Sequence, residues 1–154
     1  MRKAFVVIAL LFASSQCLAD DFNVEDPSLS DPPPTVQSAI RGHPSYAEYK
    51  RCALIGKQIR LSATPYASYF AATTSNGCNW GAALGPIWLV TFNSRRGKVV
   101  AAFGGASVTV GAHSHHGLRD LEISTGTSAR YEERLWQFNG TQYTKTRQRV
   151  GLPR

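Results

Sequence analysis

Three histidines lie within four consecutive positions in the C-terminal half of the chain. They are His113, His115 and His116, and imidazole nitrogens are common ligands of zinc and other transition metals. On a strand, His113 and His115 would share one face while His116 would point to the other. The sequence has no Cys-x-x-Cys or His-Glu-x-x-His motif to complete a ligand set. We therefore interpret the cluster as a polar turn and expect no bound metal or cofactor, with a metal-binding protein as an alternative.

Carboxylates form the second candidate cluster. Asp120 and Glu122 alternate with apolar residues, and Glu132 and Glu133 follow in the next apolar segment. Two carboxylates that face each other across a cleft can act as general acid and general base on a sugar bond. The alternation is also typical of a strand whose polar face is solvated, with arginines of a neighbouring strand opposite the acids. We favour solvated cross-strand pairs, and a small envelope hydrolase that uses these carboxylates with a histidine is the alternative.

The chain is basic, with 17 Lys and Arg against 10 Asp and Glu and a net charge of +7. Arg95, Arg96 and Lys98 crowd one expected turn, and a basic tail runs from Lys145 to Arg154. A field of this sign attracts anionic partners. An acidic protein or an anionic envelope polymer fits it, whereas nucleic acid is not expected outside the cell. A charge that only keeps the protein soluble is the alternative.

One aromatic side chain stands out in a segment of small residues. Trp80 lies between Asn79 and Pro86, next to a cysteine and between two expected strands. A loop of this kind is a natural recognition surface, because loops carry function and tryptophan is a frequent anchor at interfaces. The alternative is that Trp80 forms a lid on the core.

The N-terminus predicts export. Arg2 and Lys3 precede an apolar run and small residues, which is typical of a secretory signal peptide over residues 1–19. Removal of this leader would lower the net charge by two, to +5. No other apolar run approaches the roughly 20 residues that span a bilayer. We expect a periplasmic or secreted protein without a transmembrane segment.

Removal of the leader also takes Cys17 and leaves Cys52 and Cys78. In an oxidising compartment an even number of cysteines favours a disulfide, so we predict that these two are paired. A lipidated Cys17 is the alternative, but Gln16 stands where lipoprotein signals usually carry a small residue. A soluble mature protein is therefore preferred.

The remaining chain predicts a single α+β domain over residues 35–154, preceded by a flexible or loosely docked, acidic and proline-rich arm over residues 20–34. Ser45 and Glu48 have the spacing of a capping box and predict a short helix from about Tyr46 to Ile55. The rest indicates an antiparallel β meander of about six to eight short strands, covered by that helix. The expected strands are 58–63, 68–73, 87–93, 98–103, 107–112, 118–124, 131–138 and 141–145.

Three segments carry a resemblance. Cys78-Asn79-Trp80-Gly81, the strand Gly117-Leu118-Arg119-Asp120-Leu121 and the hairpin around Asn139-Gly140 resemble small secreted or periplasmic bacterial proteins of largely uncharacterised function. The last two are also similar to modules of periplasmic lysozyme inhibitors and envelope immunity proteins. The Ser-Gly-x-x-Tyr inhibitory motif of several such inhibitors and the Asp-x-Asp-x-Asp-Gly calcium loop of related repeats are absent from the sequence. The resemblance therefore implies a β module and carries over no inhibitory residues.

These observations favour binding over catalysis, and we assign no catalytic residue. We expect a protein-binding module, with an inhibitor or immunity protein against a cell-envelope (peptidoglycan) hydrolase or a toxin as its specific version. A rigid sheet would present the expected contact residues to the cleft of the partner. These residues are Trp80, Arg95, Arg96, His113, His115, His116 and Arg119.

Overall fold

The computed structural model describes residues 21–151 except 63–66, 82–83 and 128–129. The predicted signal peptide over 1–19, with Cys17, lies outside the described residues, as does Arg154. In the described part of the chain, no helix has the length and apolar character needed to cross a bilayer.

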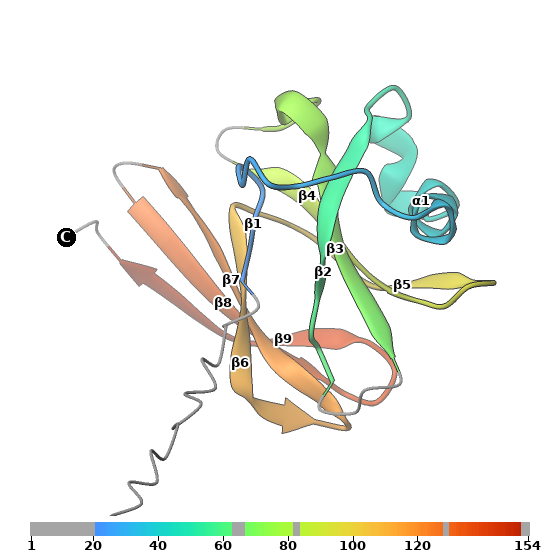
Figure 1. Ribbon diagram of the computed structural model, residues 1–154. Helices are drawn as coiled ribbons and strands as arrows, with labels where there is room; N and C mark the ends of the chain where they lie inside the picture. Colours follow the sequence, from blue (N-terminus) through green and yellow to red (C-terminus); the bar gives the residue numbers. More distant parts are fainter. Residues whose placement is uncertain (1–20, 63–66, 82–83, 128–129, 152–154) are drawn as a thin grey trace, which may run out of the picture.

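The described residues form one α-helix, two short 3₁₀ helices and nine strands (Figure 1). The first half contains β1 (Phe22–Asn23), α1 (Pro34–Arg41), η1 (Pro44–Tyr49), β2 (Leu54–Ile59), β3 (Ser68–Thr74) and η2 (Ser75–Gly77). The second half contains β4 (Gly85–Phe92), β5 (Gly97–Gly105), β6 (Ser107–His115), β7 (Leu118–Thr127), β8 (Arg130–Phe138) and β9 (Tyr143–Gly151). The α+β class, the antiparallel meander and the single α-helix are confirmed.

The strands make two antiparallel sheets. The four-stranded sheet has the order β2-β3-β4-β5 and the five-stranded sheet the order β1-β6-β7-β8-β9. Ala106 alone connects β5 to β6, so the chain passes directly from one sheet into the other. The Ala106 N–H donates to the carbonyl of Ser124 at 2.8 Å, and the Ala106 carbonyl accepts from the N–H of Val24 at 3.0 Å. These two hydrogen bonds therefore fix Ala106, the point at which the chain passes from one sheet to the other.

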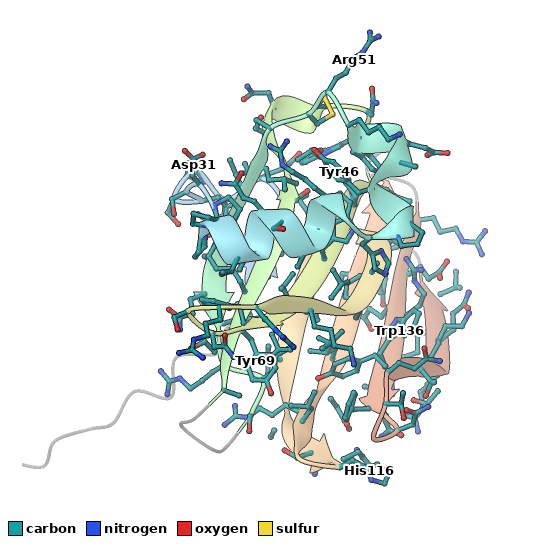
Figure 2. The ribbon with its side chains drawn as sticks, turned by 90° about the vertical axis from the view of Figure 1, so that its right-hand side faces the viewer. Asp31, Tyr46, Arg51, Tyr69, His116 and Trp136 are labelled. Carbon is teal, nitrogen blue, oxygen red and sulfur yellow. A yellow bond between two sulfur atoms is a disulfide. The ribbon has the colours of Figure 1, made fainter. Side chains whose placement is uncertain are left out.

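The four-stranded sheet is covered on both faces, which explains the nearly continuous apolar sequence of β4. Ile87 and Leu89 lie in the core between the two sheets. Trp88 and Val90 alternate with them and lie in a second core beneath α1 and η1. Figure 2 shows α1 lying across this face of the sheet. The molecule thus has three layers: helix, four-stranded sheet and five-stranded sheet.

The helix predicted from Tyr46 to Ile55 is wrong. The α-helix is α1, which begins with Pro34 at its first turn, where a missing N–H is harmless, and ends at Arg41, with Gly42 as its C-cap. Residues 44–49 form only the 3₁₀ helix η1, whose N-cap is His43 rather than Ser45. The chain then extends into β2 because Leu54 and Gly56 are buried on one face of the four-stranded sheet.

The segment expected as a flexible or loosely docked arm is anchored to the domain at two places. Phe22 and Val24 are two positions apart and therefore point to the same side of an extended chain; both are buried in the core between the sheets. Further along, Ser30 and Gly56 exchange backbone hydrogen bonds of 2.8 and 3.0 Å across the outer edge of β2. Because the segment is acidic and proline-rich overall, its composition does not predict the burial of these two apolar side chains.

Candidate functional site

The predicted Cys52–Cys78 disulfide is present. It ties the segment that follows η1 to the loop that precedes β4. A second link supports the same junction, because the Asn79 side-chain amide donates to the carbonyl of Glu48 at 2.6 Å. Both cysteines are thus structural.

Trp80 lies against the core as a lid. Its indole N–H donates to the Thr74 hydroxyl at 2.7 Å. Its ring covers Gly85 so closely that a Cβ there would come within 2.9 Å of the ring. The side chain is partly buried against the core between the sheets. The indole N–H and part of the ring of the tryptophan expected as a partner anchor are therefore already engaged within the protein.

The histidine cluster lies at the end of the β6–β7 hairpin. Nδ1 of His115 lies 2.6 Å from the carboxylate of Asp120, and the other oxygen of Asp120 accepts from the Gln137 amide at 3.1 Å. His113 and His116 are exposed. The described residues contain no group of three or more His, Cys, Asp and Glu side chains arranged to hold a metal ion.

The remaining carboxylates do not converge with this pair. Glu132 pairs with Arg134 along β8 at 3.2 Å. Glu122 and Glu133 line a small hollow of about 110 Å³ on the outer face of the five-stranded sheet, together with Leu135, Arg147 and Arg149. The acids therefore lie in separate places on the five-stranded sheet.

The expected contact residues lie in separate parts of the molecule. The segment between β3 and β4, which contains Trp80, lies at the top of Figure 1, whereas the β6–β7 hairpin lies at the bottom. Figure 2 shows His116 at that lower end and Arg51, next to the disulfide, at the opposite end. Arg95 and Arg96 lie in the β4–β5 turn. One partner surface cannot be built from all of these residues.

Tyr143 is buried beside Asp120 and donates its hydroxyl to the Arg119 carbonyl at 2.8 Å. Burial raises the pKa of this phenol, and the neighbouring Tyr69 and Asp120 raise it further. The unfolded chain loses the same proton near its ordinary pKa of about 10. Above that pH the folded protein binds more protons than the unfolded chain. The free energy of unfolding should therefore fall as pH rises above about 10, by up to about 1.4 kcal/mol per pH unit.

Urea denaturation at several pH values between about 9 and 12 measures this slope. Tyr143→Phe should cost about 1 kcal/mol at neutral pH through the lost hydrogen bond, and should reduce the alkaline slope. Tyr131→Phe is the matched control, because Tyr131 is 40% exposed. Equal alkaline slopes in the wild type and Tyr143→Phe would contradict the assignment.

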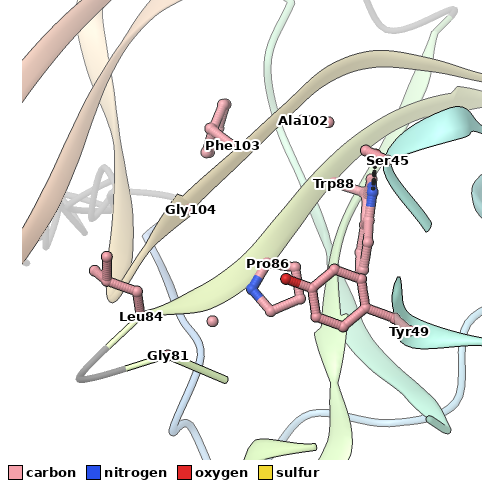
Figure 3. Close-up of a pocket in the computed structure, with 10 residues that line it drawn as sticks. Ser45, Tyr49, Gly81, Leu84, Pro86, Trp88, Ala102, Phe103 and Gly104 are labelled. Carbon is pink, nitrogen blue, oxygen red and sulfur yellow. Dashed lines mark hydrogen bonds between the residues drawn. The ribbon is translucent and has the colours of Figure 1, made fainter. Parts of the chain in front are cut away.

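A hollow of about 260 Å³ lies beside η1, on the helix-covered face of the four-stranded sheet (Figure 3). The rings of Tyr49, Pro86 and Trp88 line it, and the small residues Ala102 and Gly104 of β5 border it. The Ser45 hydroxyl accepts from the Trp88 indole at 2.8 Å and lies 2.7 Å from Nδ1 of His43. This hydroxyl fixes the orientation of Trp88, so the hollow has a preformed aromatic wall.

A second hollow, of about 390 Å³, also borders β5. Its lining includes β5 from Lys98 to Phe103 on one side, and Trp136 and Tyr143 of the five-stranded sheet on the other. Phe103 and Trp136 stack with ring centroids 5.6 Å apart. The buried indole N–H of Trp136 has no acceptor among the described residues, which is uncommon for a buried donor. Ala102 and Phe103 line both hollows.

At three of the four sheet edges the outermost strand is very short, bridged or charged, although β1 pairs with β6 only at Ser107 and Val108. β1 has only two residues, the outer edge of β2 is bridged by Ser30, and β9 carries the exposed cations Lys145, Arg147 and Arg149. Short strands, covering segments and charged side chains are the usual protection of a free edge.

The fourth edge, β5, differs from the others. It pairs with β4 on one side, and no described strand pairs with it on the other. From Val99 to Gly105 it carries no charged side chain. From its sequence this run is an ordinary expected strand, 98–103, and its uncharged, small-residue composition is the signal that sets it apart. No protein-family model, curated protein or solved structure matches the chain.

Proposed function

We propose that the protein is a protein-binding module that takes up an extended segment of another protein along the free edge of β5. This mode is strand addition: backbone hydrogen bonds to the edge supply affinity, and pockets for alternate side chains supply specificity. The partner class is the one expected from the sequence, a hydrolase or toxin of the cell envelope. An inhibitor or immunity protein would act by occupying a segment that its target needs.

The contrast between β5 and the other edges carries the proposal. A long, uncharged edge strand invites pairing with other chains, and proteins usually protect such edges. Here β1, β2 and β9 have protection of three kinds. From Val99 to Phe103, β5 has no charged side chain and no described strand on its outer side, and at Gly104 its carbonyl accepts from the Arg134 side chain at 3.0 Å. An edge left open in this way is suited to a partner strand.

The two hollows support the same site. Successive side chains of a strand point to opposite faces of its sheet. A strand added beside β5 would therefore direct alternate side chains toward the hollow of Tyr49 and Trp88 and toward the hollow of Trp136. Trp136 lines the second hollow, and its buried indole N–H lacks an acceptor among the described residues.

A hydrolase is the second candidate, and one observation favours it. The contact of 2.6 Å between His115 and Asp120 resembles the way in which acids orient a catalytic imidazole. A substrate pocket is the missing part, because neither side chain lines any of the three hollows described above. Binding at β5 therefore has more structural support.

Site-specific photo-crosslinking tests the proposal. The full chain, with a photoreactive amino acid at the exposed position Ala102, is expressed in the cells from which the gene comes and irradiated. The matched control places the same group at Thr146, exposed on the other long edge, β9. We expect a discrete adduct from position 102 alone, joined to an extended segment of an envelope hydrolase or toxin. Equal adducts at both positions, no adduct, or an adduct only with a second copy of the chain would overturn it.

A further inference from the structure

The charge of the four-stranded sheet restricts what can bind beside it. Between Glu48 and Asp120 the sequence contains no acidic residue. All four strands of this sheet and all of their connections lie in that interval. A segment added to β5 therefore meets basic side chains and no acidic ones from the sheet that it extends.

Positive charge is concentrated at one end of β5. Arg95, Arg96 and Lys98 are exposed, and none of them forms an ion pair with a described residue. The turn that carries them is ordered by Asn93, whose side-chain oxygen accepts from the N–H groups of Arg95 and Arg96 at 2.8 and 2.9 Å. The backbone of the turn is therefore ordered, and its three cations have no ion-pair partner in the part of the chain that the structure describes.

The other end of β5 has apolar neighbours. Ala102 and Gly104 border the hollow that is walled by Tyr49, Pro86 and Trp88 (Figure 3). An aromatic, proline or aliphatic side chain fits such a wall. The edge therefore changes along its length, from three cations without an ion-pair partner among the described residues near Lys98 to aromatic walls near Gly104. The cation at that second end, Arg134, donates to the Gly104 carbonyl at 3.0 Å and is paired with Glu132.

Orientation follows from the sheet. Every strand pair in the two sheets is antiparallel, and antiparallel pairing is the more stable per residue. A segment that pairs with β5 in this direction has its N-terminal part beside Gly104 and its C-terminal part beside Lys98.

We infer that β5 selects an extended peptide segment that is apolar or aromatic toward its N-terminal end and acidic toward its C-terminal end. This inference rests on the proposed strand addition and specifies the chemistry of the segment. Asp and Glu side chains near the end of the segment pair with Arg95, Arg96 and Lys98. A large apolar side chain near its start enters the hollow of Tyr49 and Trp88.

Selection from random sequences is the first part of the test. The probe is a library of short linear peptides, free of fixed charges, selected on the immobilised full-length protein. We expect enrichment of acidic residues toward the C-terminal end and of aromatic residues, proline or leucine toward the N-terminal end. A selected peptide and the same sequence written in reverse are then compared by fluorescence anisotropy, with the reversed peptide expected to bind roughly tenfold more weakly.

Charge removal is the second part, with two variants that each lose three cations. Arg95→Gln, Arg96→Gln and Lys98→Gln together should weaken binding roughly tenfold and flatten its salt dependence. Lys145→Gln, Arg147→Gln and Arg149→Gln, on β9, should change affinity less than about twofold. Circular dichroism checks that both variants are folded. The comparison of forward and reversed peptides uses only the wild-type protein, so it does not depend on the folding of a variant.

The outcomes separate this inference from the proposed function. Specific crosslinking at Ala102 without acidic enrichment, or with equal weakening by both charge variants, overturns the inferred peptide chemistry and leaves strand addition standing. Absence of both the crosslink and any selected peptide overturns the two together. An acidic peptide that binds equally well in reverse overturns the orientation.

Discussion

Replacement of Trp88 with alanine is expected to lower the free energy of unfolding by about 3–5 kcal/mol, the range for removal of a fully buried large aromatic side chain. Trp88 is 1% exposed and lies at the centre of the core beneath α1 and η1. The rings of Tyr46 and Tyr49 meet it edge to face, with centroids 5.7 and 5.4 Å away. Alanine would leave a cavity between the sheet and both helical segments, and would leave the Ser45 hydroxyl without its indole donor.

Urea denaturation followed by far-UV circular dichroism measures this loss. Trp80→Ala is the matched control, because the Trp80 ring is only partly buried and covers the edge of the core. Its cost should be clearly smaller. A loss for Trp88→Ala that does not exceed the loss for Trp80→Ala would contradict the central position of Trp88. Trp88→Phe should restore part of the stability by filling part of the cavity.

Removal of the disulfide should have the second largest effect. Cys52 and Cys78 are separated by 26 positions. On the chain-entropy account, a crosslink over a loop of this length stabilises the fold by roughly 3 kcal/mol, because it restricts the unfolded chain. The double variant Cys52→Ala, Cys78→Ala should therefore unfold at lower urea with about this loss in free energy.

Reduction of the wild-type protein provides the control for the disulfide. A reductant should lower the stability of the wild type to about the level of the double variant, and should leave the double variant unchanged. A double variant within about 0.5 kcal/mol of the oxidised protein would show that the hydrogen bond from Asn79 to Glu48 and the local packing hold this junction alone.

Much of the β structure was predictable, because local signals coincided with the tertiary arrangement. The segments 68–73, 87–93 and 98–103 alternate or run in apolar residues between turn residues, and they correspond to β3, β4 and β5. The pairing of Cys52 with Cys78 was predictable from the number of cysteines and the expected export alone. In these places the period of the sequence and the burial of the side chains agree.

The helix was misplaced because two capping signals competed. Ser45 and Glu48 have capping-box spacing, but a helix through Ile55 would have removed Leu54 and Gly56 from the buried face of β2. Pro34 marked the true start of the helix. The pairing requirements of the sheet therefore overrode a local propensity, as they commonly do.

The candidate site was the least predictable part. Its walls come from η1, β4, β5 and β8, and no local pattern brings Tyr49, Trp88 and Trp136 to one strand edge. The two tryptophans also differ from their sequence context. Trp80 is isolated among small residues, which favours a contact role, yet it covers the core. Trp136 is part of an ordinary aromatic strand pattern, yet it lines the hollow beside β5. Only the arrangement of the sheets shows which edge lacks a neighbour.

The pairing of β1 with β6 has a consequence for the order of folding. The other strand pairs join strands that are consecutive in the chain, whereas Phe22 must meet Val108. Loop-closure entropy delays contacts between distant residues, and hairpins close within microseconds. We therefore expect the N-terminal strand to dock last, after β6 has formed. In that order of events, the hairpins are assembled before Phe22 enters its position in the core.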